Sequence, residues 1–499
     1  MKGTGLPEHA MFAPSQRVHF IGIGGIGMSG IAEILLTMGY AVSGSDLRSS
    51  GVTERLERLG ATVFLGHAAS NAAGSDVVVT SSAIVPDNPE VLMAREQKIP
   101  VIQRAEMLAE LMRLKYGIAI AGMHGKTTTT SMVAAVLAGG ELDPTVVVGG
   151  RVDALGSNAR LGRSQYLVAE ADESDRSFLK LSPILSVVTN LDREHMDSYA
   201  DMGDVENCFV EFMDKVPFYG AVTACVDDSR LREVLPRVRR KVYTYGTAPE
   251  ADFRLRLLPI EIVSGVASDE DSRACRPCAR FEVTARGLVW GPFELHVPGR
   301  HNILNATAAV AIGVQLGLAP ERIAAGLASF RGVDRRFQVR GVEGGVTVID
   351  DYGHHPTEIR ATLQAARECG YGRVLVLFQP HRYSRTRDLM AEFATAFAEA
   401  DSVVVLDIYA ASEQPIEGIT GQALAEAIGK KKSGRVSYAP SITEAVEHLA
   451  RDARPGEMIL TLGAGSVSQA GPLLLQALRA KTLRTDPNEP GAGGREASM

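Results

Sequence analysis

The sequence is poor in the features that would place it in a membrane, outside the cell or on a nucleic acid. It has five cysteines in 499 residues, scattered and odd in number, which is typical of a reducing compartment. No apolar run is long enough to span a bilayer, and residues 1–17 contain charges and two prolines but no apolar signal region. The net charge of −7 disfavours a nucleic-acid partner, because phosphate binding favours a basic surface. We therefore expect a soluble cytoplasmic protein with neither membrane insertion nor a nucleic-acid partner.

The chain instead alternates between short strand-like runs and amphipathic helix patterns, which predicts parallel α/β architecture. We expect three blocks, over residues 1–113, 114–333 and 334–484, and a disordered tail over residues 485–499 that is rich in Gly, Pro, Glu and Ser. The runs expected to form strands are Arg17–Ile23, Ala41–Ser45, Thr62–Leu65, Asp76–Ser81, Tyr116–Ala121, Tyr166–Glu170, Ile184–Asn190, Ala221–Val226, Arg280–Val289, Val346–Asp350, Val374–Phe378, Ser402–Asp407 and Met458–Leu462.

The most informative stretch is residues 120–130, which read Ile-Ala-Gly-Met-His-Gly-Lys-Thr-Thr-Thr-Thr between a strand-like run and a helix pattern. Glycines allow backbone N–H groups to approach phosphate oxygens, the helix N-terminus adds a positive field, and Lys126 adds charge. Thr127 would place a hydroxyl on Mg²⁺. The loop is shorter than the standard P-loop, because Ile120 stands where that pattern has glycine. We predict a triphosphate site at Gly122, Met123, His124, Gly125, Lys126, Thr127 and Thr128; the alternative is an ordinary glycine turn before a helix.

A second glycine motif stands near the N-terminus. Gly22, Gly24 and Gly27 form a GxGxxG pattern between a strand and a helix, and Asp46 ends the next strand, where a dinucleotide fold holds a ribose hydroxyl. The pattern indicates a nucleotide diphosphate but does not choose between NAD and a UDP-sugar. A dehydrogenase, and a glycine turn without a ligand, therefore remain alternatives here.

Two polar clusters follow strands of the second block. Glu170–Asp175 offers several carboxylates, which are the oxygen ligands that Mg²⁺ prefers, and Asn190–Asp197 contains His195. His195 could bind a metal or orient another ligand; the alternatives are a solvated acidic loop and an isolated surface histidine. Two asparagines near the start of a later helix, Asn302 and Asn305, could contact a nucleotide, although their spacing alone favours helix capping.

The third block carries acids, histidines and arginines after two of its strands, in Asp350–Pro356 and Pro380–Arg387. A small zwitterion needs a carboxylate for its ammonium and an arginine for its carboxylate, and Asp351 with Arg382 or Arg385 would supply both. Structural ion pairs are the alternative.

Taken in this order, the motifs resemble the Mur ligases over roughly Val18–Leu478. The segments that carry the resemblance are Gly22–Gly30, Gly122–Thr130, Glu170–Asp175, His195–Asp197, His301–Asn305, Asp350–Pro356 and Pro380–Arg387. The resemblance implies a Rossmann-like N-terminal domain that binds a UDP-sugar, a central P-loop-type ATPase domain with a mixed or parallel sheet, and a Rossmann-like C-terminal domain that binds an amino acid. It also implies ATP-dependent joining of L-alanine to the lactyl carboxylate of UDP-N-acetylmuramate through an acyl phosphate, with Mg²⁺ or Mn²⁺, in peptidoglycan precursor synthesis by a monomer or homodimer.

The same resemblance implies functions for individual residues. Lys126, Glu170 and His195 would be catalytic, and Thr127, Glu170 and His195 would bind the metal. Further ATP contacts would be Asn302, Asn305, Arg336 and Asp351. The UDP-sugar would be bound by Gly22, Gly24, Gly25, Gly27, Asp46, Ser81 and Ser82. The alanine would be bound by Tyr352, His354, Arg382 and Arg385.

The sequence departs from the family pattern in two places: Met123 stands where the family usually has threonine, and residues 264–280 form an insertion. The carbamylated lysine of sibling ligases has no equivalent that can be placed here, and the resemblance implies a branch that manages without it. Cys275 and Cys278 in the insertion lack a second CxxC for a zinc site, so we expect them to be loop cysteines. Alternatives to the alanine ligase are a tripeptide ligase, whose first glycine loop differs from Gly24-Gly-Ile-Gly27, a dehydrogenase, and a catalytically silent nucleotide-binding regulator.

Overall fold

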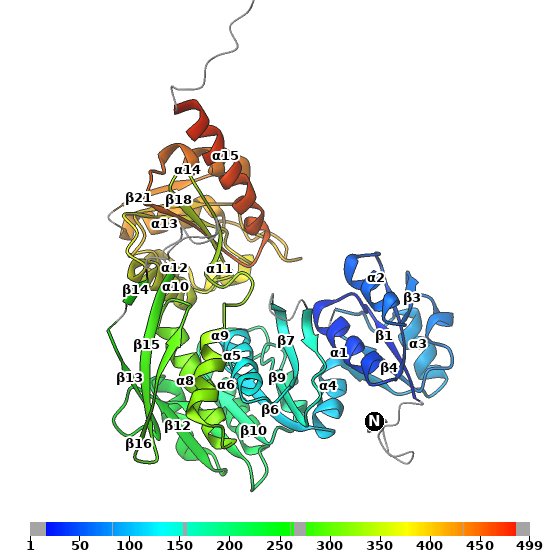
Figure 1. Cartoon of the computed structure of the whole chain (residues 1–499). Coiled ribbons are helices and arrows are strands. Elements are labelled where there is room, and N and C mark those ends of the chain that lie inside the picture. The colour runs from blue at the N-terminus through cyan, green and yellow to red at the C-terminus, as the bar shows by residue number, and fades with distance from the viewer. Residues whose placement is uncertain are drawn as a thin grey trace, which may run out of the picture. The chain divides into compact units, whose positions relative to one another are not determined.

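The computed structural model describes residues 16–81, 83–152, 157–259, 261–263, 276–432 and 434–485. The chain divides into two compact units (Figure 1). The first comprises Met1–Leu258, Arg280–Leu295 and Asn302–Asp334, and the second comprises Pro259–Ala279, His296–His301 and Arg335–Met499. No helix in the described part of the chain is long and apolar enough to cross a membrane.

The N-terminal part of the first unit is a parallel five-stranded sheet in the order β3-β2-β1-β4-β5, drawn in blue in Figure 1 with helices packed around it. This order is that of a Rossmann-like fold. Its strands are β1 (Arg17–Ile21), β2 (Ala41–Asp46), β3 (Thr62–Leu65), β4 (Val77–Thr80) and β5 (Val101–Gln103), and its helices are α1 (Ile26–Thr37), α2 (Gly51–Arg58), η1 (Ala69–Ala72), α3 (Pro89–Glu96) and α4 (Arg104–Arg113). Parallel strands end at one edge of their sheet, so the glycine motif after β1 lies beside the end of β2.

The central part of the first unit is built on a larger, mixed sheet. Parallel strands run in the order β12-β11-β10-β6-β9-β7, and β8 pairs antiparallel with β7. The strands are β6 (Tyr116–Ala121), β7 (Thr145–Val152), β8 (Ser157–Arg160), β9 (Tyr166–Glu170), β10 (Leu185–Val188), β11 (Ala221–Cys225), β12 (Val242–Gly246), β13 (Phe253–Leu257), most of β15 (Arg276–Ala285) and β16 (Leu288–Leu295), whereas β14 (Glu261–Val263) is counted with the second unit. The helices are α5 (Lys126–Gly139), η3 (Ser177–Lys180), α6 (Met202–Asp214), α7 (Ser229–Val234), η4 (Leu235–Arg237), α8 (Arg300–Gln315) and α9 (Pro320–Ser329). Strand β6 lies between β9 and β10, so the lysine loop is flanked by the polar segments that follow both neighbours.

One expected strand is wrong. Arg280–Val289 was expected to be a single strand-like segment, but the chain turns at Arg286 and Gly287, which have φ angles of 52° and 75°. Two consecutive residues with positive φ form the kind of tight turn that joins antiparallel strands. The segment is therefore the end of β15, a turn and the start of β16.

The sheet of the second unit has the order β17-β18-β22-β19-β20-β21, with β17 antiparallel and the other neighbours parallel. Its elements are β17 (Gln338–Glu343), β18 (Val346–Asp351), α10 (Pro356–Glu368), β19 (Val374–Phe378), α11 (Tyr383–Asp388), α12 (Met390–Ala396), β20 (Ser402–Val405), α13 (Gly421–Lys431), β21 (Arg435–Tyr438), α14 (Ile442–Asp452), β22 (Met458–Leu462), η6 (Ser466–Gln469) and α15 (Ala470–Thr485). Consecutive strand residues point to opposite faces, so Ile349 joins the apolar cluster of α10, α12 and α13, and Val348 joins that of α14 and α15. Both faces are covered, as expected for an α/β domain.

The predicted α/β class, with parallel and mixed sheets, is confirmed. Helix α15 ends at Thr485, the first residue of the expected tail. Residues 486–499, Ser82, Cys275 and most of the 264–280 insertion lie outside the described residues, as does the side chain of Cys278.

A buried carboxylate joins several elements of the N-terminal sheet. The Glu90 side chain on α3 is fully buried and accepts hydrogen bonds from Ser45 Oγ at 2.6 Å, Asn71 Nδ2 at 2.8 Å and Ala68 N at 3.2 Å, and His19 Nε2 lies 3.3 Å away. Burial alone would raise the pKa of Glu90, but the hydrogen bonds from His19, Ser45 and Asn71 outweigh it and hold the pKa below the ordinary value.

We expect Glu90→Gln to destabilise this sheet by about 2–3 kcal/mol at pH 7, because the surrounding donors lose a charged acceptor. A depressed pKa contributes stability above the unfolded pKa and loses it as pH falls through the folded pKa. The difference in stability between the Glu90→Gln variant and the unmodified protein should therefore become smaller as the pH is lowered. Hydrogen exchange of peptides from β1 and β2 at neutral and acidic pH would measure it.

The control is Glu96→Gln, at an exposed position of the same helix. Equal protection of β1 and β2 in the Glu90 and Glu96 variants at pH 7 would show that the buried carboxylate contributes nothing to stability.

Candidate active site

The lysine loop lies between β6 and α5, and its two glycines are required by close approaches. Gly122 has φ 132°, and a Cβ there would lie 2.0 Å from Thr189 Oγ1. Gly125, the N-cap of α5, has φ 82°, and a Cβ there would lie 2.8 Å from Asn305 Oδ1. Only glycine combines these backbone conformations with the absence of a side chain.

Lys126 is the first residue of α5, and its side chain turns back over the loop. The Nζ donates to the carbonyl oxygens of Gly122 at 2.8 Å and Met123 at 3.1 Å, and to Glu173 Oε1 at 2.8 Å. Burial alone would lower the pKa of Lys126, but the Glu173 and Glu170 carboxylates outweigh it and hold the pKa above the ordinary value. Lys126 is therefore a buried permanent cation, the kind of group that binds phosphate oxygens.

Met123, the departure from the family pattern, contributes through its main chain. Its carbonyl oxygen accepts from Lys126, its N donates to the Asn190 carbonyl at 3.4 Å, and its side chain is buried. The substitution therefore leaves the main-chain part of the loop intact.

Glu173 is a site residue that we did not predict. Its side chain is 1% exposed; Oε1 pairs with Lys126 and lies 3.5 Å from His195 Nε2, while Oε2 accepts no hydrogen bond from any described residue. Burial raises the pKa of Glu173 to about 7, against the opposing effect of Lys126. Glu173 lies within the acidic segment Glu170–Asp175, which was predicted to bind a metal, but nothing in the sequence distinguishes its function from that of Glu170.

Two of the three predicted metal ligands, Thr127 and Glu170, contact each other, and the third, His195, contacts Glu173. Thr127 Oγ1 donates to Glu170 Oε2 at 2.9 Å, and His195 lies against Glu173. The hydroxyl and carboxylate oxygens of the first pair suit Mg²⁺, which prefers oxygen ligands. The unpartnered Oε2 of Glu173 adds a further carboxylate oxygen, so the residues present fit a divalent cation.

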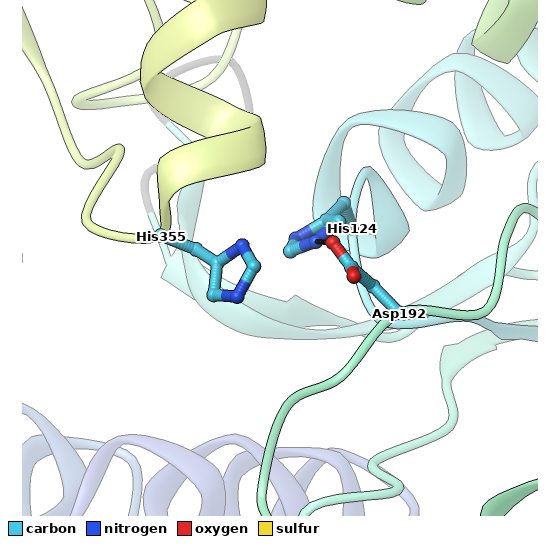
Figure 2. A group of neighbouring side chains, drawn as sticks. All are labelled: His124, Asp192 and His355. Carbon is cyan, nitrogen blue, oxygen red and sulfur yellow. Dashed lines mark hydrogen bonds and ion pairs between the residues drawn. The ribbon is translucent and has the colours of Figure 1, made fainter. Parts of the chain in front are cut away.

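The segment after β10 supports the lysine loop from the other side. Asn190 Oδ1 accepts from His124 N at 2.9 Å, Asn190 Nδ2 donates to His124 O at 2.9 Å, and Thr189 Oγ1 donates to the same oxygen at 2.7 Å. Figure 2 shows the His124 ring beside the Asp192 carboxylate, with Nε2 and Oδ2 separated by 2.9 Å. His124 was predicted to contact ATP, and the structure shows it as the residue that fixes the loop to this segment.

The remaining predicted ATP residues of the first unit lie on the two helices beside the lysine loop. Asn302 and Asn305 are buried on α8, with Asn305 against Gly125, and Thr128 is buried on α5. The expectation from spacing alone, that the asparagines cap a helix, is wrong because α8 begins at Arg300, ahead of both.

The N-terminal glycine motif and Asp46 come together as predicted for a nucleotide site. Asp46 Oδ2 accepts from Gly24 N at 2.9 Å, and Gly25 N donates to Gly22 O at 3.0 Å. Ser81 directly follows β4 and is partly buried. Arg104, which we did not predict, lies over the first turn of α1: a Cβ on Gly27 would be 2.7 Å from its Nη1, and its Nη2 lies 3.3 Å from Asp172 Oδ2.

The second unit gathers three of the four predicted alanine residues around His381. The His381 ring centroid lies 5.7 Å from that of His354, which in turn lies 5.4 Å from Tyr352, and Arg385 Nη1 is 3.3 Å from His381 Nδ1. Burial, His354 and the arginines lower the pKa of His381 to about 4, so its ring is neutral at pH 7. The main-chain N of Arg382 donates to Tyr409 O at 2.8 Å, and Arg382 precedes α11 with φ 72°.

Asp351 does not fit the expectation that it receives an ammonium group. It is 5% exposed, and its two oxygens accept from the main-chain N of Phe337 and of Gly353, both at 2.7 Å. It therefore shapes the turn that carries Arg336. Arg336 in turn lies 3.5 Å from Glu358 Oε1 and 5.1 Å from the centre of the Tyr352 ring. His355, also drawn in Figure 2, caps α10 by accepting from Thr357 N.

A buried lysine in a glycine loop, with hydroxyl and carboxylate groups at the ends of adjacent strands, is typical of enzymes that use a nucleoside triphosphate. The chain belongs to the Mur ligase family: residues 17–116 match the family's "catalytic domain", residues 120–313 its "middle domain" and residues 335–465 its "glutamate ligase domain". The resemblance read from the motifs is thus confirmed.

Individual relatives are similar over almost the whole chain. A UDP-N-acetylmuramate–L-alanine ligase of Acidobacterium capsulatum is 67% identical over 94% of this chain and 99% of its own length. One of Koribacter versatilis is 64% identical over 95% of this chain and 100% of its own. The crystal structure of the UDP-N-acetylmuramate–alanine ligase of Thermotoga maritima is 29% identical, covers 93% of this chain and 99% of that one, and superposes with a TM-score of 0.74.

We expect Gly122→Ala to weaken ATP binding at least about 100-fold, because the added methyl would collide with Thr189 and displace the loop. Calorimetric titration with Mg·ATP would measure the loss. The matched control is Gly60→Ala: Gly60 has φ 103°, but a Cβ there has nothing within 4 Å. Equal ATP affinity in both variants would show that the close approach at Gly122 does not shape the nucleotide site.

Proposed function

We propose that this chain joins L-alanine to the lactyl carboxylate of UDP-N-acetylmuramate, converting ATP to ADP and phosphate, and so supplies a precursor of peptidoglycan. The observation that carries the proposal is the cluster of Lys126, Thr127, Glu170, Glu173 and His195 at the ends of adjacent strands, in a chain 67% identical to a ligase of that name. The three described free cysteines are all buried, which supports a cytoplasmic setting.

The chemistry requires activation of a poor electrophile. ATP transfers its γ-phosphoryl group to the lactyl carboxylate, which becomes an acyl phosphate. The free amine of alanine then attacks the acyl carbon, and the tetrahedral intermediate expels phosphate to leave the amide. No protein nucleophile is needed, so the protein contributes positioning and charge stabilisation.

Lys126 is the group suited to the first step. Its ammonium is charged and held by the loop carbonyls, so exchanging its Glu173 partner for a phosphate oxygen would let it neutralise charge on the transferred phosphoryl group. Thr127 and Glu170 would hold Mg²⁺, with His195 and Glu173 beside them. A bound Mg²⁺ would supply further positive charge to the phosphates.

We assign the sugar nucleotide to the loop of Gly22, Gly24, Gly25 and Gly27, with Asp46 and Ser81. The pyrophosphate would lie at the N-terminus of α1, where backbone N–H groups and the Arg104 guanidinium meet. We assign alanine to Tyr352, His354, Arg382 and Arg385, with the neutral His381 beside His354 and Arg385. Here the arginine forks would bind the alanine carboxylate.

We expect phosphate release from Mg·ATP and UDP-N-acetylmuramate to require L-alanine, with a product heavier by one alanyl residue. Parallel reactions would contain L-Ala-γ-D-Glu-diaminopimelate or no acceptor, and product masses would be read by mass spectrometry. Release only with the tripeptide would indicate a recycling ligase. If no phosphate is released with either acceptor, the regulator and dehydrogenase alternatives would be reopened, and nicotinamide fluorescence on titration would then test the dehydrogenase.

We expect Lys126→Ala to abolish turnover, with a loss of at least about 10³-fold, because the variant lacks the ammonium that the loop carbonyls hold. UDP-N-acetylmuramate binding, measured by calorimetry, should remain within about twofold, since the glycine motif of the N-terminal sheet is separate from this loop. Loss of sugar-nucleotide binding in this variant would contradict the assignment of the two nucleotides to different sheets.

A further inference from the structure

Two loops that carry site residues are joined by a buried hydroxyl. Tyr199 is 3% exposed, and its hydroxyl donates to the Glu173 carbonyl oxygen at 2.5 Å. The same carbonyl accepts from Arg176 N at 3.0 Å. The loop after β9, which carries Glu170 and Glu173, is thus joined to the loop after β10, which carries His195.

Arg176 joins the same loops a second time. Its Nε donates to Ser198 O at 2.9 Å, and its guanidinium carbon lies 4.9 Å from the centre of the Tyr199 ring. The guanidinium also pairs with Asp204 in the first turn of α6, and Asp204 accepts from Ala200 N at 3.0 Å. The Tyr199 ring is therefore held by a cation on its face and a hydrogen bond at its tip.

The segment held in this way includes a strained residue. His195 has φ 56°, in the left-handed region that non-glycine residues rarely adopt, and its carbonyl accepts from Ser198 N at 2.8 Å. Such a conformation persists where the surrounding contacts over-determine it. Ser198 and Tyr199, three and four residues along, are the points at which Arg176 and Glu173 hold the turn.

We propose that Tyr199 and Arg176 are positioning residues that lock the strained turn of His195 against Glu173 and so set the geometry of the cation site. The proposal rests on the proposed function, in which His195 and Glu170 serve a divalent cation. Tyr199 and Arg176 act through the Glu173 main chain and the Ser198 carbonyl. Partners behind metal ligands often change metal affinity as strongly as some ligands do.

The test is Tyr199→Phe, which removes the hydroxyl and keeps the ring. We expect Mn²⁺ affinity, read from free Mn²⁺ by electron paramagnetic resonance in the presence of ATP, to fall about three- to tenfold. The KM for Mg·ATP should rise by a similar factor, while UDP-N-acetylmuramate affinity and the melting temperature stay unchanged. The control is Tyr245→Phe, which removes the hydroxyl of a buried tyrosine on β12.

Each outcome decides the proposal. Mn²⁺ affinity equal to that of the Tyr245→Phe control would overturn it, as would no Mn²⁺ binding by the unmodified protein. A parallel loss of sugar-nucleotide affinity would reveal a merely structural role. If Tyr199→Phe fails to fold, Arg176→Lys, which keeps the charge but loses the Nε contact, must show the same selective loss of Mn²⁺ affinity. A third outcome would separate the two proposals. If Tyr199→Phe weakens Mn²⁺ binding but the unmodified protein shows no alanine-dependent turnover, the positioning role would stand and the proposed function would be rejected.

Discussion

The buried ion pair between Lys126 and Glu173 is the interaction on which the rest of the site depends. The two side chains are 14% and 1% exposed, so neither charge is well solvated and each needs the other. Lys126 is fixed by the start of α5, and Glu173 by the loop after β9. The pair can form only because β9 is the neighbour of β6 in the sheet. Strand order, more than loop composition, therefore brings Lys126 to its partner.

The sequence predicted the features that are local. Short, continuously apolar runs located the strands around the site to within two residues, and the glycine patterns located both glycine loops, because a tight turn between a strand and a helix has a short-range signature. Glu173, Arg104 and His381 could not be singled out in the same way. Each matters because of a neighbour far along the chain, and which neighbour it meets is decided by sheet order.

The sequence also could not distinguish a polar group that binds a ligand from one that binds the protein's own backbone. Asp351 looked like a partner for an ammonium group, yet both of its oxygens accept main-chain N–H groups. Asp46 likewise accepts from Gly24 N while standing where a ribose would lie. A carboxylate at the end of a strand can serve either purpose, because main-chain N–H groups and ligand donors both need a hydrogen-bond acceptor.

The ion pair between Lys126 and Glu173 also favours a ligand with several negative charges. A ligand that draws Lys126 from Glu173 must offer negative charge of its own, since a buried ammonium without a counter-charge is strongly disfavoured. A triphosphate meets that demand and a neutral ligand does not. The same reasoning explains why the contacts between the loops after β9 and β10 matter. A site built from opposed charges keeps its geometry only if the loop that carries the carboxylates and the loop that carries His195 are both prevented from rearranging. Preorganised charge of this kind lowers the barrier to phosphoryl transfer because the protein need not reorganise when the reaction occurs.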